Sequence, residues 1–273
     1  YVLNLIGEIE KLDKKNDYFI LLRKKYYQKV HFANPRFKKV LADYPHYSLK
    51  EQFFLPFQLI KLKPDLVHFP HFNVPFFWWG KQIVTIHDLI KHQSRGARTT
   101  TKWSLFYWFK FLNYRFLVWL VVNRVARIIV PSQWTKTELT RRYHLPPEKI
   151  MVTYEGVEKK FSNFRIFEFS KIKILKKYKI KKPFVIYTGS LYPHKNVQNL
   201  VKAVKKINLR LVIVCSRNVF YERFKKEIKK LKAEKLVTLT GFVPDKDLVA
   251  LYQQAEAFVF PSLLEGFGLP GLE

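Results

Sequence analysis

Two glutamates and a glycine-rich turn stand close together near the C-terminal end of the sequence. Glu265 and Glu273 are separated by seven residues, and the turn Gly266–Gly268 lies between them. The apolar run Phe258–Phe260 before the turn is typical of a strand buried on both faces, and Pro270 suits the first turn of a helix. A strand that ends in a glycine turn before a helix presents backbone N–H groups that bind phosphate. Because carboxylates accept hydrogen bonds from hydroxyls, the pattern favours a phosphorylated sugar over phosphate alone.

A second corner of the same kind lies earlier in the chain. The apolar run Phe184–Tyr187 leads into the turn Thr188-Gly189-Ser190, and a helix is predicted over Asn196–Lys206. Lys195 precedes this helix and is a point charge suited to neutralising a diphosphate. The alternative is that Lys195 is one more surface lysine in a lysine-rich chain.

Three histidines follow short apolar runs of the type found in parallel strands: His68, His71 and His87. A histidine at such a strand end can contact a substrate, or it can face solvent, as we expect of His92. Together the three could suggest a metal site, but no other residue pattern supports one. We therefore expect no metal.

The elements that must position these residues alternate between strands and helices. This alternation predicts doubly wound parallel sheets, in which ligands bind beyond the carboxyl ends of the strands. No G-x-G-x-x-G is present, which argues against an NAD enzyme. Helices are predicted at residues 1–11, 49–62, 196–206, 221–233 and 247–254, and a further helix is predicted to begin at residue 135. Strands are predicted at 18–22, 29–32, 66–69, 83–86, 127–130, 184–187, 211–215, 237–239 and 258–260. Ser132 and Asp245 are the predicted caps of two of these helices.

The pattern divides the chain into an N-terminal domain of residues 1–157, a partly helical linker of residues 158–182 and a C-terminal domain of residues 183–273. The first residue is Tyr rather than Met, and the last lies one turn into a predicted helix. We therefore expect a fragment cut at both ends. The single cysteine, Cys215, excludes an internal disulfide framework, and its apolar neighbours predict a core position.

The formal net charge of +29 indicates an acidic partner or surface, such as nucleic acid or an anionic membrane. The basic residues are scattered in pairs and triplets, and solvated helix faces would look the same. Residues 103–122 are long and apolar enough to span a bilayer, but Lys110, Asn113 and Arg115 are costly in lipid. Two readings stay open: a helix whose aromatic face reaches the membrane interface, and a large core helix.

The stretch Ala255–Glu273, AEAFVFPSLLEGFGLPGLE, resembles the E-x7-E signature of the retaining glycosyltransferases of family 4, which are GT-B enzymes. Residues 85–89 (TIHDL), 128–139 (IIVPSQWTKTEL) and 187–204 (YTGSLYPHKNVQNLVKAV) resemble other segments of the family. The resemblance implies an α/β GT-B fold: two Rossmann-like, doubly wound parallel-sheet domains face a cleft, and the C-terminal domain is incomplete here. It also implies a nucleoside-diphosphate sugar as donor, with no cofactor and no metal.

The resemblance assigns roles residue by residue. His87 would contact the transferred sugar or the acceptor, Lys195 would stabilise the departing diphosphate, and Glu265 would orient the donor sugar. The residues expected to bind the donor are Gly189, Ser190, Lys195, Val243, Gly266, Phe267, Gly268, Leu269 and Glu273. Two departures, Ser190 and His194, stand where many members have arginine, and they would weaken diphosphate binding.

The function implied by the resemblance is transfer of a hexose, with retention, to a glycan or lipid-linked acceptor in cell-envelope polysaccharide synthesis. Mannose is the hexose that similarity to lipopolysaccharide and exopolysaccharide members suggests. A lipid-linked acceptor would place the protein in the cytoplasm at the inner face of an anionic membrane. The alternatives are a catalytically degenerate nucleotide-sugar binder and a basic nucleic-acid-binding protein. Because the charges are scattered, no nucleic acid is expected as a partner.

Overall fold

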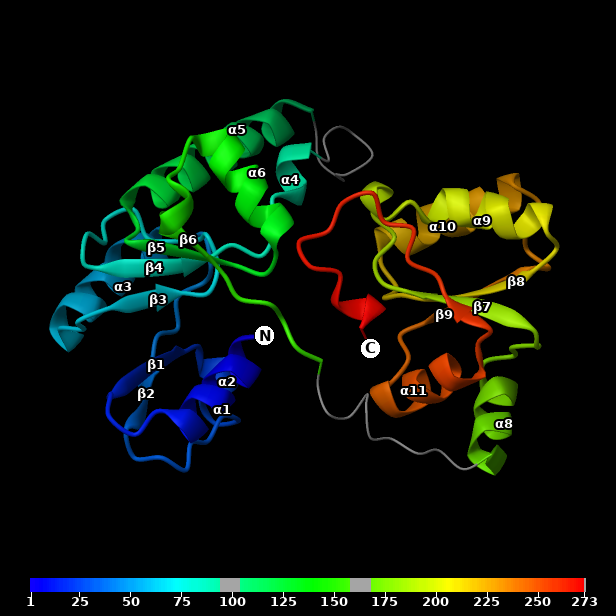
Figure 1. The fold of residues 1–273 in the computed structure, drawn as a ribbon, viewed down its shortest axis with the longest axis horizontal. Coiled ribbons are helices and arrows are strands. Elements are labelled where there is room, and N and C mark those ends of the chain that lie inside the picture. The colour runs from blue at the N-terminus through cyan, green and yellow to red at the C-terminus, as the bar shows by residue number, and fades with distance from the viewer. Residues whose placement is uncertain (94–103, 158–167, 273) are drawn as a thin grey trace. The chain divides into compact units, whose positions relative to one another are not determined.

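The computed structural model describes residues 1–93, 104–157 and 168–272 (Figure 1). Contacts divide the chain into two compact units. The first unit comprises Tyr1–Ile86, Asn113–Val130 and Leu139–Met151, and the second comprises His87–Leu112, Pro131–Glu138 and Val152–Glu273. The domain boundaries predicted from the sequence stay a prediction, and residues 158–167 of the predicted linker lie outside the described part of the chain.

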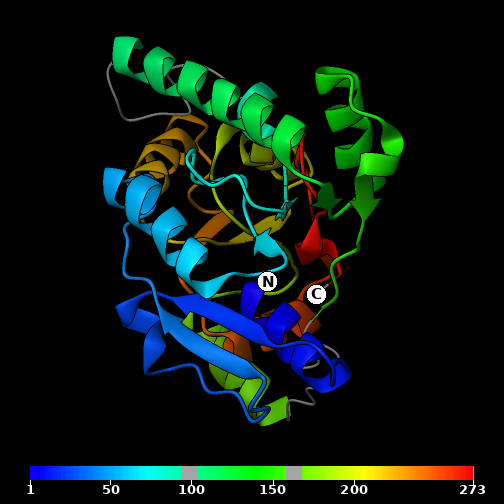
Figure 2. The same ribbon diagram turned by 90° about the vertical axis from the view of Figure 1, so that its left-hand side faces the viewer.

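The first unit begins with a parallel pair of strands, β1 (Tyr18–Leu22) and β2 (Phe37–Leu41). Helix α1 (Val2–Leu12) lies beside this pair (Figure 2), and the one-turn helix α2 (Lys24–Tyr27) follows β1. The strand predicted at residues 29–32 is wrong. The second strand begins at Phe37 instead, where the buried ring of Phe37 stacks on Tyr18 with 4.4 Å between ring centroids.

A four-stranded sheet with the order β3-β4-β5-β6 forms the centre of the first unit. Its strands are β3 (Val67–Phe69), β4 (Gln82–Thr85), β5 (Arg127–Val130) and β6 (Ile150–Val152), and the pairs β3–β4 and β4–β5 are parallel. Val84, Ile128 and Val130 are fully buried in the strands. The parallel pairing of these strands confirms the predicted parallel sheet.

Helix α3 (Leu49–Leu62) has clear start and stop signals. The hydroxyl of Ser48 accepts a hydrogen bond from the backbone N–H of Glu51 (3.1 Å), which caps the N-terminus. Lys63 ends the helix in the left-handed conformation, with φ of 48°, immediately before Pro64. The helix therefore occupies the residues that the sequence predicted.

The remaining helices before the second sheet are α4 (Ile90–Gln93), α5 (Ser104–Arg124), α6 (Gln133–Tyr143) and the 3-10 turn η2 (Pro147–Lys149). His92 in α4 is buried, so the expected solvent-facing position is wrong. None of the helices among the described residues has the length and apolar character needed to cross a bilayer.

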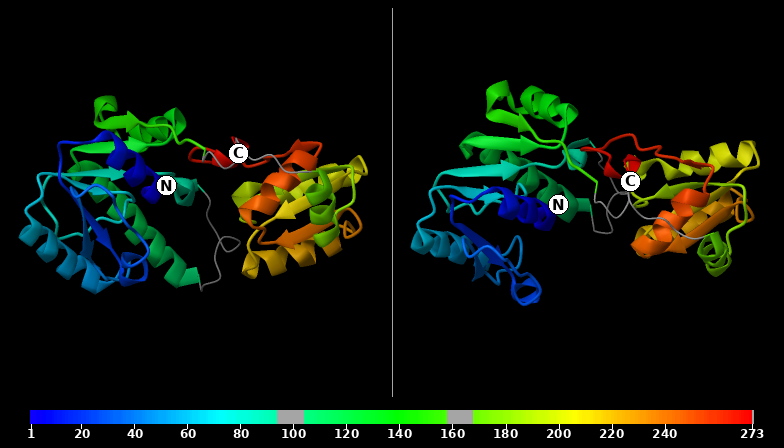
Figure 3. Two further views of the ribbon diagram at one scale, coloured as in Figure 1. Left: turned by 90° about the horizontal axis from the view of Figure 1, so that it is seen from below. Right: turned by 60° about the horizontal axis from the view of Figure 1, so that its bottom comes forward.

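The second unit holds a parallel four-stranded sheet with the order β10-β7-β8-β9. Its strands are β7 (Phe184–Thr188), β8 (Arg210–Val214), β9 (Val237–Gly241) and β10 (Ala257–Phe258), and its helices are α8 (Glu168–Lys177), α9 (Val197–Lys206), α10 (Val219–Lys230) and α11 (Asp245–Gln254). Figures 1 and 3 show α9 and α10 on one face of the sheet and α8 and α11 on the other.

Two hydrophobic clusters, one on each face, hold these layers together. Val185 and Tyr187 pack with residues of α9 and α10, whereas Phe184 and Ile186 pack with residues of α8 and α11. Successive residues of β7 therefore point to opposite faces, and both faces are covered. Cys215 is buried in the first of these clusters, as predicted.

Two sequence predictions in the second unit need correction, and a third, the helical turn at Pro270, is found as a 3-10 turn. The strand at residues 258–260 is shorter than predicted, because β10 covers only Ala257–Phe258, and Phe258 is partly exposed rather than buried on both faces. Pro270 lies in a one-turn 3-10 helix, η4 (Leu269–Gly271). Asp245 does not cap α11: Pro244 is the N-cap, and Asp245 lies in the first turn.

Candidate active site

The loops that follow β7 and β10 lie side by side in the second unit. Because the two strands pair in parallel, their carboxyl ends meet at one edge of the sheet. The side-chain amide of Asn196 donates to the carbonyl of Pro261 (3.1 Å), and the backbone N–H of Leu263 donates to the carbonyl of His194 (2.8 Å). The two corners that the sequence singled out are thus joined into one site.

Lys195 and Glu265 form an ion pair at this edge. The Lys195 Nζ atom lies 2.5 Å from Glu265 Oε1, and the two side chains are 16% and 20% exposed. The ammonium also lies 5.8 Å from the centroid of the Phe260 ring. The structure therefore brings together two of the three predicted catalytic residues, and it holds both where water is partly excluded and charges act strongly.

The turn after β7 has the backbone geometry that a glycine permits. Gly189 has φ of 151°, its N–H donates to the carbonyl of Val214 (3.0 Å), and an added Cβ would lie 2.8 Å from the Tyr187 hydroxyl oxygen. That hydroxyl donates to the carbonyl of Ser190 (2.7 Å). Burial, and then the charge of Glu265, raise the pKa of Tyr187 far above its usual value, so the phenol keeps its proton and remains a donor.

Gly266 fits closely against another segment of the second unit. A Cβ on Gly266 would lie 2.0 Å from the backbone carbonyl oxygen of His87. The carbonyl of Gly266 accepts hydrogen bonds from the hydroxyls of Ser132 (2.5 Å) and Thr135 (3.2 Å). Ser132 also accepts the N–H of Thr135 (3.2 Å), which confirms its predicted role at the start of α6. The glycine turn thus lies against two segments that are distant in sequence, one at His87 and one at Ser132–Thr135.

His87, the third predicted catalytic residue, is oriented by a carboxylate that sequence reasoning did not identify. Its Nδ1 atom lies 3.2 Å from Glu155 Oε1. The neighbouring Asp88 accepts the N–H of Ile90 (2.9 Å) and so helps to hold the loop. Glu155 follows β6 by three residues, and a carboxylate just beyond a strand end was the signal that could have revealed it.

His194 is a neutral neighbour of Lys195. Burial, and then the positive charge of Lys195, lower the pKa of His194 below its ordinary value of 6.5. Its ring stacks on Tyr192, with 5.9 Å between centroids. Because His194 carries no charge at pH 7, Lys195 is the cation that this turn offers to an anion.

The other residues predicted to bind the donor differ in their burial and in their contacts. Val243 is buried in the cluster beneath α11, so its side chain is not available to a ligand. The Phe267 ring lies 6.2 Å from that of Tyr154. Gly268, with φ of 90°, is the N-cap of η4, which begins at Leu269. Glu273 lies outside the described residues.

Arg217 is a further cation at this edge of the sheet. It follows β8, is exposed, and lies over Gly241, where an added Cβ would be 2.7 Å from Arg217 Nε. Gly241 has φ of 77°, a conformation that favours glycine. A basic side chain directly after a parallel strand was the signal for this residue.

In the part of the chain that the structure describes, no three His, Cys, Asp or Glu side chains group as metal ligands. His68 Nε2 lies 2.8 Å from the hydroxyl oxygen of Thr85, within hydrogen-bonding distance.

Comparison with known proteins decides the family. The sequence model described as Glycosyltransferase Family 4 matches residues 9–161, more than half of the chain, and the model described as Glycosyl transferases group 1 matches residues 170–273. The chain belongs to glycosyltransferase family 4. The expectation drawn from the E-x7-E stretch and the segments around residues 85, 128 and 187 is therefore confirmed.

The curated relatives of this family 4 chain include mannosyltransferases. The O-antigen chain mannosyltransferase RfbU of Salmonella typhimurium is 29% identical over 211 residues, which cover 76% of this chain and 52% of RfbU. The serotype-specific mannosyltransferase WbdA of Escherichia coli is 28% identical over 219 residues, which cover 76% of this chain and 25% of WbdA. The chain thus spans about half of RfbU and a quarter of WbdA.

Solved structures share its fold. Anabaena HepE, solved in complex with UDP and glucose, aligns with a TM-score of 0.66 at 17% identity, covering 98% of this chain and 72% of HepE. Sucrose-phosphate synthase from Thermosynechococcus elongatus aligns with a TM-score of 0.66 at 17% identity, covering 92% of this chain and 67% of the synthase. The predicted GT-B fold, built on parallel α/β sheets, is confirmed.

Proposed function

We propose that this family 4 chain transfers a hexose from a nucleoside-diphosphate sugar to a glycan or lipid-linked acceptor in cell-envelope polysaccharide synthesis. The observation that carries the proposal is the Lys195–Glu265 ion pair beside the glycine turn at Gly266, at the edge where parallel sheets bind ligands. The family supplies the reaction class, and the names of RfbU and WbdA supply the mannose and the polysaccharide context.

Each residue of this edge has a proposed task. The Lys195 ammonium would turn from Glu265 to the departing diphosphate and stabilise its charge, which is electrostatic catalysis of bond cleavage. Glu265, once released, would accept hydrogen bonds from hydroxyls of the donor sugar. His87, oriented by Glu155, would contact the sugar or the acceptor. We propose that the anomeric configuration is retained and that no metal takes part, because Lys195 and backbone N–H groups offer the positive charge.

The proposed place of action is the inner face of the cytoplasmic membrane, where the chain would be peripheral. Two observations support it: a formal net charge of +29 and the aromatic helix α5, in which Phe109, Phe116 and Trp119 are exposed. Exposure of these rings favours the reading of residues 103–122 as an interfacial helix over that of a core helix, although residue 103 lies outside the described residues.

Calorimetric titration of GDP, UDP and their mannose and glucose conjugates tests the donor site. One nucleotide should bind, and Lys195→Ala should weaken its binding at least about tenfold, the usual effect of losing a charge-assisted contact to phosphate. Lys202→Ala removes an exposed lysine of α9 and should leave affinity unchanged. Folded protein that binds none of these nucleotides would refute the donor site.

A second function, a nucleotide-sugar binder without transfer, is favoured by Ser190 and by the neutral His194, since this turn carries one cation where the family resemblance implies more. A product assay separates the two. Radiolabelled sugar should move from the bound donor to a polyprenyl-diphosphate glycan acceptor. Tight donor binding without product would support the degenerate member.

A further inference from the structure

Helix α3 presents an apolar stripe that the core of the first unit does not use. Phe53, Phe57 and Ile60 follow one another at helical spacing, and each is more than half exposed, at 56%, 56% and 61%. The buried residues of α3, which include Leu59, serve the core instead. A row of exposed large apolar side chains on a capped helix marks a surface that contacts something apolar.

The turn before β4 extends this stripe. Phe77 stacks on Phe53, with 4.8 Å between centroids, and Phe76 meets Phe77 edge to face at 5.3 Å. Trp79 is 72% exposed. We call these residues, with Phe57, the aromatic surface of the first unit.

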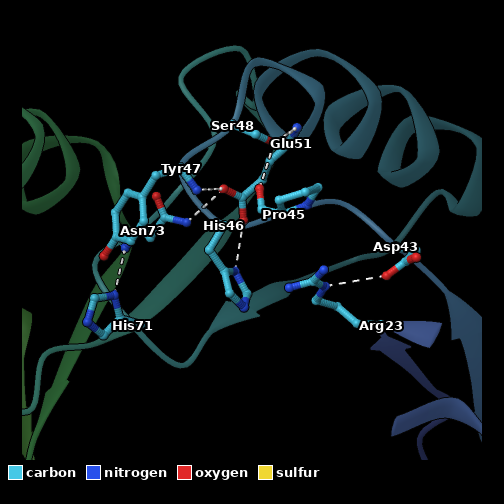
Figure 4. Close-up of polar contacts among 9 residues, drawn as sticks. All are labelled: Arg23, Asp43, Pro45, His46, Tyr47, Ser48, Glu51, His71 and Asn73. Carbon is cyan, nitrogen blue, oxygen red and sulfur yellow. Dashed lines mark hydrogen bonds and ion pairs between the residues drawn. The ribbon is translucent and has the colours of Figure 1, made fainter. Parts of the chain in front are cut away.

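The aromatic surface is held in place by buried polar contacts. Figure 4 shows the buried carboxylate of Glu51 accepting the backbone N–H of Tyr47 (2.6 Å) and the amide of Asn73 (2.9 Å). The neighbouring Gln52 accepts the N–H of Phe76 (2.7 Å). The segment that carries Phe76, Phe77 and Trp79 is thus tied to the start of α3.

The far side of the same segment is tied to the end of α5. The guanidinium of Arg124 donates to the carbonyls of Phe76 and Trp78, and it lies over the ring of Trp79 at 3.9 Å. Lys61 Nζ lies 4.5 Å from the centroid of the Phe57 ring. Two of the aromatic rings are therefore covered by a cation.

Charge indicates what kind of partner fits. Besides Lys61, α3 carries Lys50, and Lys63 follows as its C-cap, while the one acidic residue of α3, Glu51, is buried in the contacts of Figure 4. Aromatic rings interleaved with lysine and arginine are the side chains that favour the boundary between lipid headgroups and acyl chains. An acidic protein would match the charge but would leave the exposed rings of Phe57 and Trp79 without an apolar environment.

We propose that the aromatic surface of α3 and the turn of residues 75–80 docks onto an anionic lipid bilayer, with Phe57, Phe77 and Trp79 entering the interface and Lys61 and Arg124 meeting lipid phosphates. This rests on the proposed function, because a lipid-linked acceptor would lie in that membrane. It adds a surface that lies outside residues 103–122, the segment of the earlier expectation, and that meets α5 only at Arg124.

Co-sedimentation with vesicles tests the proposal without any donor or acceptor, so its outcome is independent of sugar transfer. The whole chain should sediment with vesicles of phosphatidylcholine and phosphatidylglycerol and much less with phosphatidylcholine alone. Phe57→Ser and Trp79→Ser should each weaken binding about tenfold, and Lys61→Glu should do the same at low salt only. Ile207→Ser changes an exposed apolar residue of the second unit and should bind as the unaltered chain does.

Circular dichroism and nucleotide titration of each variant show whether it is folded. If neither the unaltered chain nor any folded variant bound nucleotide, the donor site would be refuted, but the vesicle result would still hold. The proposal would be overturned if Phe57→Ser and Trp79→Ser bound vesicles as the unaltered chain does while Phe109→Ser of α5 lost vesicle binding. It would also be overturned if the Phe57→Ser and Trp79→Ser variants still bound vesicles but lost binding to single-stranded oligonucleotides or lost self-association.

Discussion

At the scale of single residues, Gly266 combines three constraints in one position. Its Cα faces the carbonyl of His87 with no room for a methyl group, and its own carbonyl receives the hydroxyls of Ser132 and Thr135. The next residue back is Glu265, which pairs with Lys195. A shift of the turn would therefore move the proposed donor site as well as strain the backbone.

Gly266→Ala should lower the free energy of unfolding by about 1–3 kcal/mol, the usual range for overpacking, because the added Cβ meets a backbone oxygen that cannot rotate away. It should also weaken nucleotide binding. Gly271→Ala is the matched control, since nothing lies within 4 Å of its added Cβ. Urea unfolding of the two variants measures the difference. Equal stabilities would show that the turn has room to move.

His194 should make the stability of the folded protein depend on pH. Its pKa is lowered in the folded protein, by burial first and then by Lys195. As pH falls through the ordinary value of 6.5, the unfolded chain takes up a proton that the folded protein refuses, so stability is present above that pH and is lost below it.

The loss should reach at most about 1.4 kcal/mol per pH unit, the limit for one proton. His194→Gln should remove this part of the slope between pH 7 and pH 5.5. Urea unfolding of the chain and the variant across that range measures it. Parallel curves would mean that His194 takes up a proton in the folded protein as readily as in the unfolded chain.

Among the helices and strands, those with local sequence signals, such as caps and continuous apolar runs, were predicted correctly. Helix α3 has a serine cap at one end and Lys63-Pro64 at the other, and strand β7 is a continuous apolar run. Strand β2 escaped prediction because Phe37–Leu41 contains two lysines and becomes a strand by pairing with β1. Long-range pairing overrides local propensity there.

The candidate site divides in the same way. Lys195 and Glu265 were found because each stands in a strand–glycine corner, and adjacent parallel strands bring such corners together. Glu155 was not found, because its role depends on which strand ends are neighbours. The contacts of Gly266 with Ser132 join residues more than a hundred positions apart, which periodicity and spacing do not encode.

The buried carboxylate of Glu51 stabilises the start of α3. Glu51→Ala should lower the free energy of unfolding by about 2–3 kcal/mol, because the N–H of Tyr47 and the amide of Asn73 lose a buried acceptor. Glu8→Ala removes an exposed carboxylate paired with Lys11 and should change it by less than about 0.5 kcal/mol. Chemical unfolding measures both. A similar small effect for the two would show that water replaces Glu51.

At the scale of the whole molecule, charge is the dominant feature. Fifty lysines and arginines stand against 21 aspartates and glutamates. Ion pairs such as Lys195–Glu265 and Lys177–Asp247 neutralise a few of these cations. The remaining positive charges are closer together in the folded chain than in an expanded one, so their mutual repulsion destabilises the folded state.

Added salt should therefore stabilise the protein. Raising NaCl from 20 to 200 mM shortens the screening length from roughly 20 Å to roughly 7 Å and should raise the melting temperature by about 2–4 °C, equivalent to ~1 kcal/mol for a chain of this size. Choline chloride at equal ionic strength should have the same effect, because screening depends on concentration and not on the cation. Thermal scans by near-ultraviolet circular dichroism measure it. A melting temperature that falls with salt would mean that ion pairs, rather than repulsion among the cations, dominate the electrostatics of this chain.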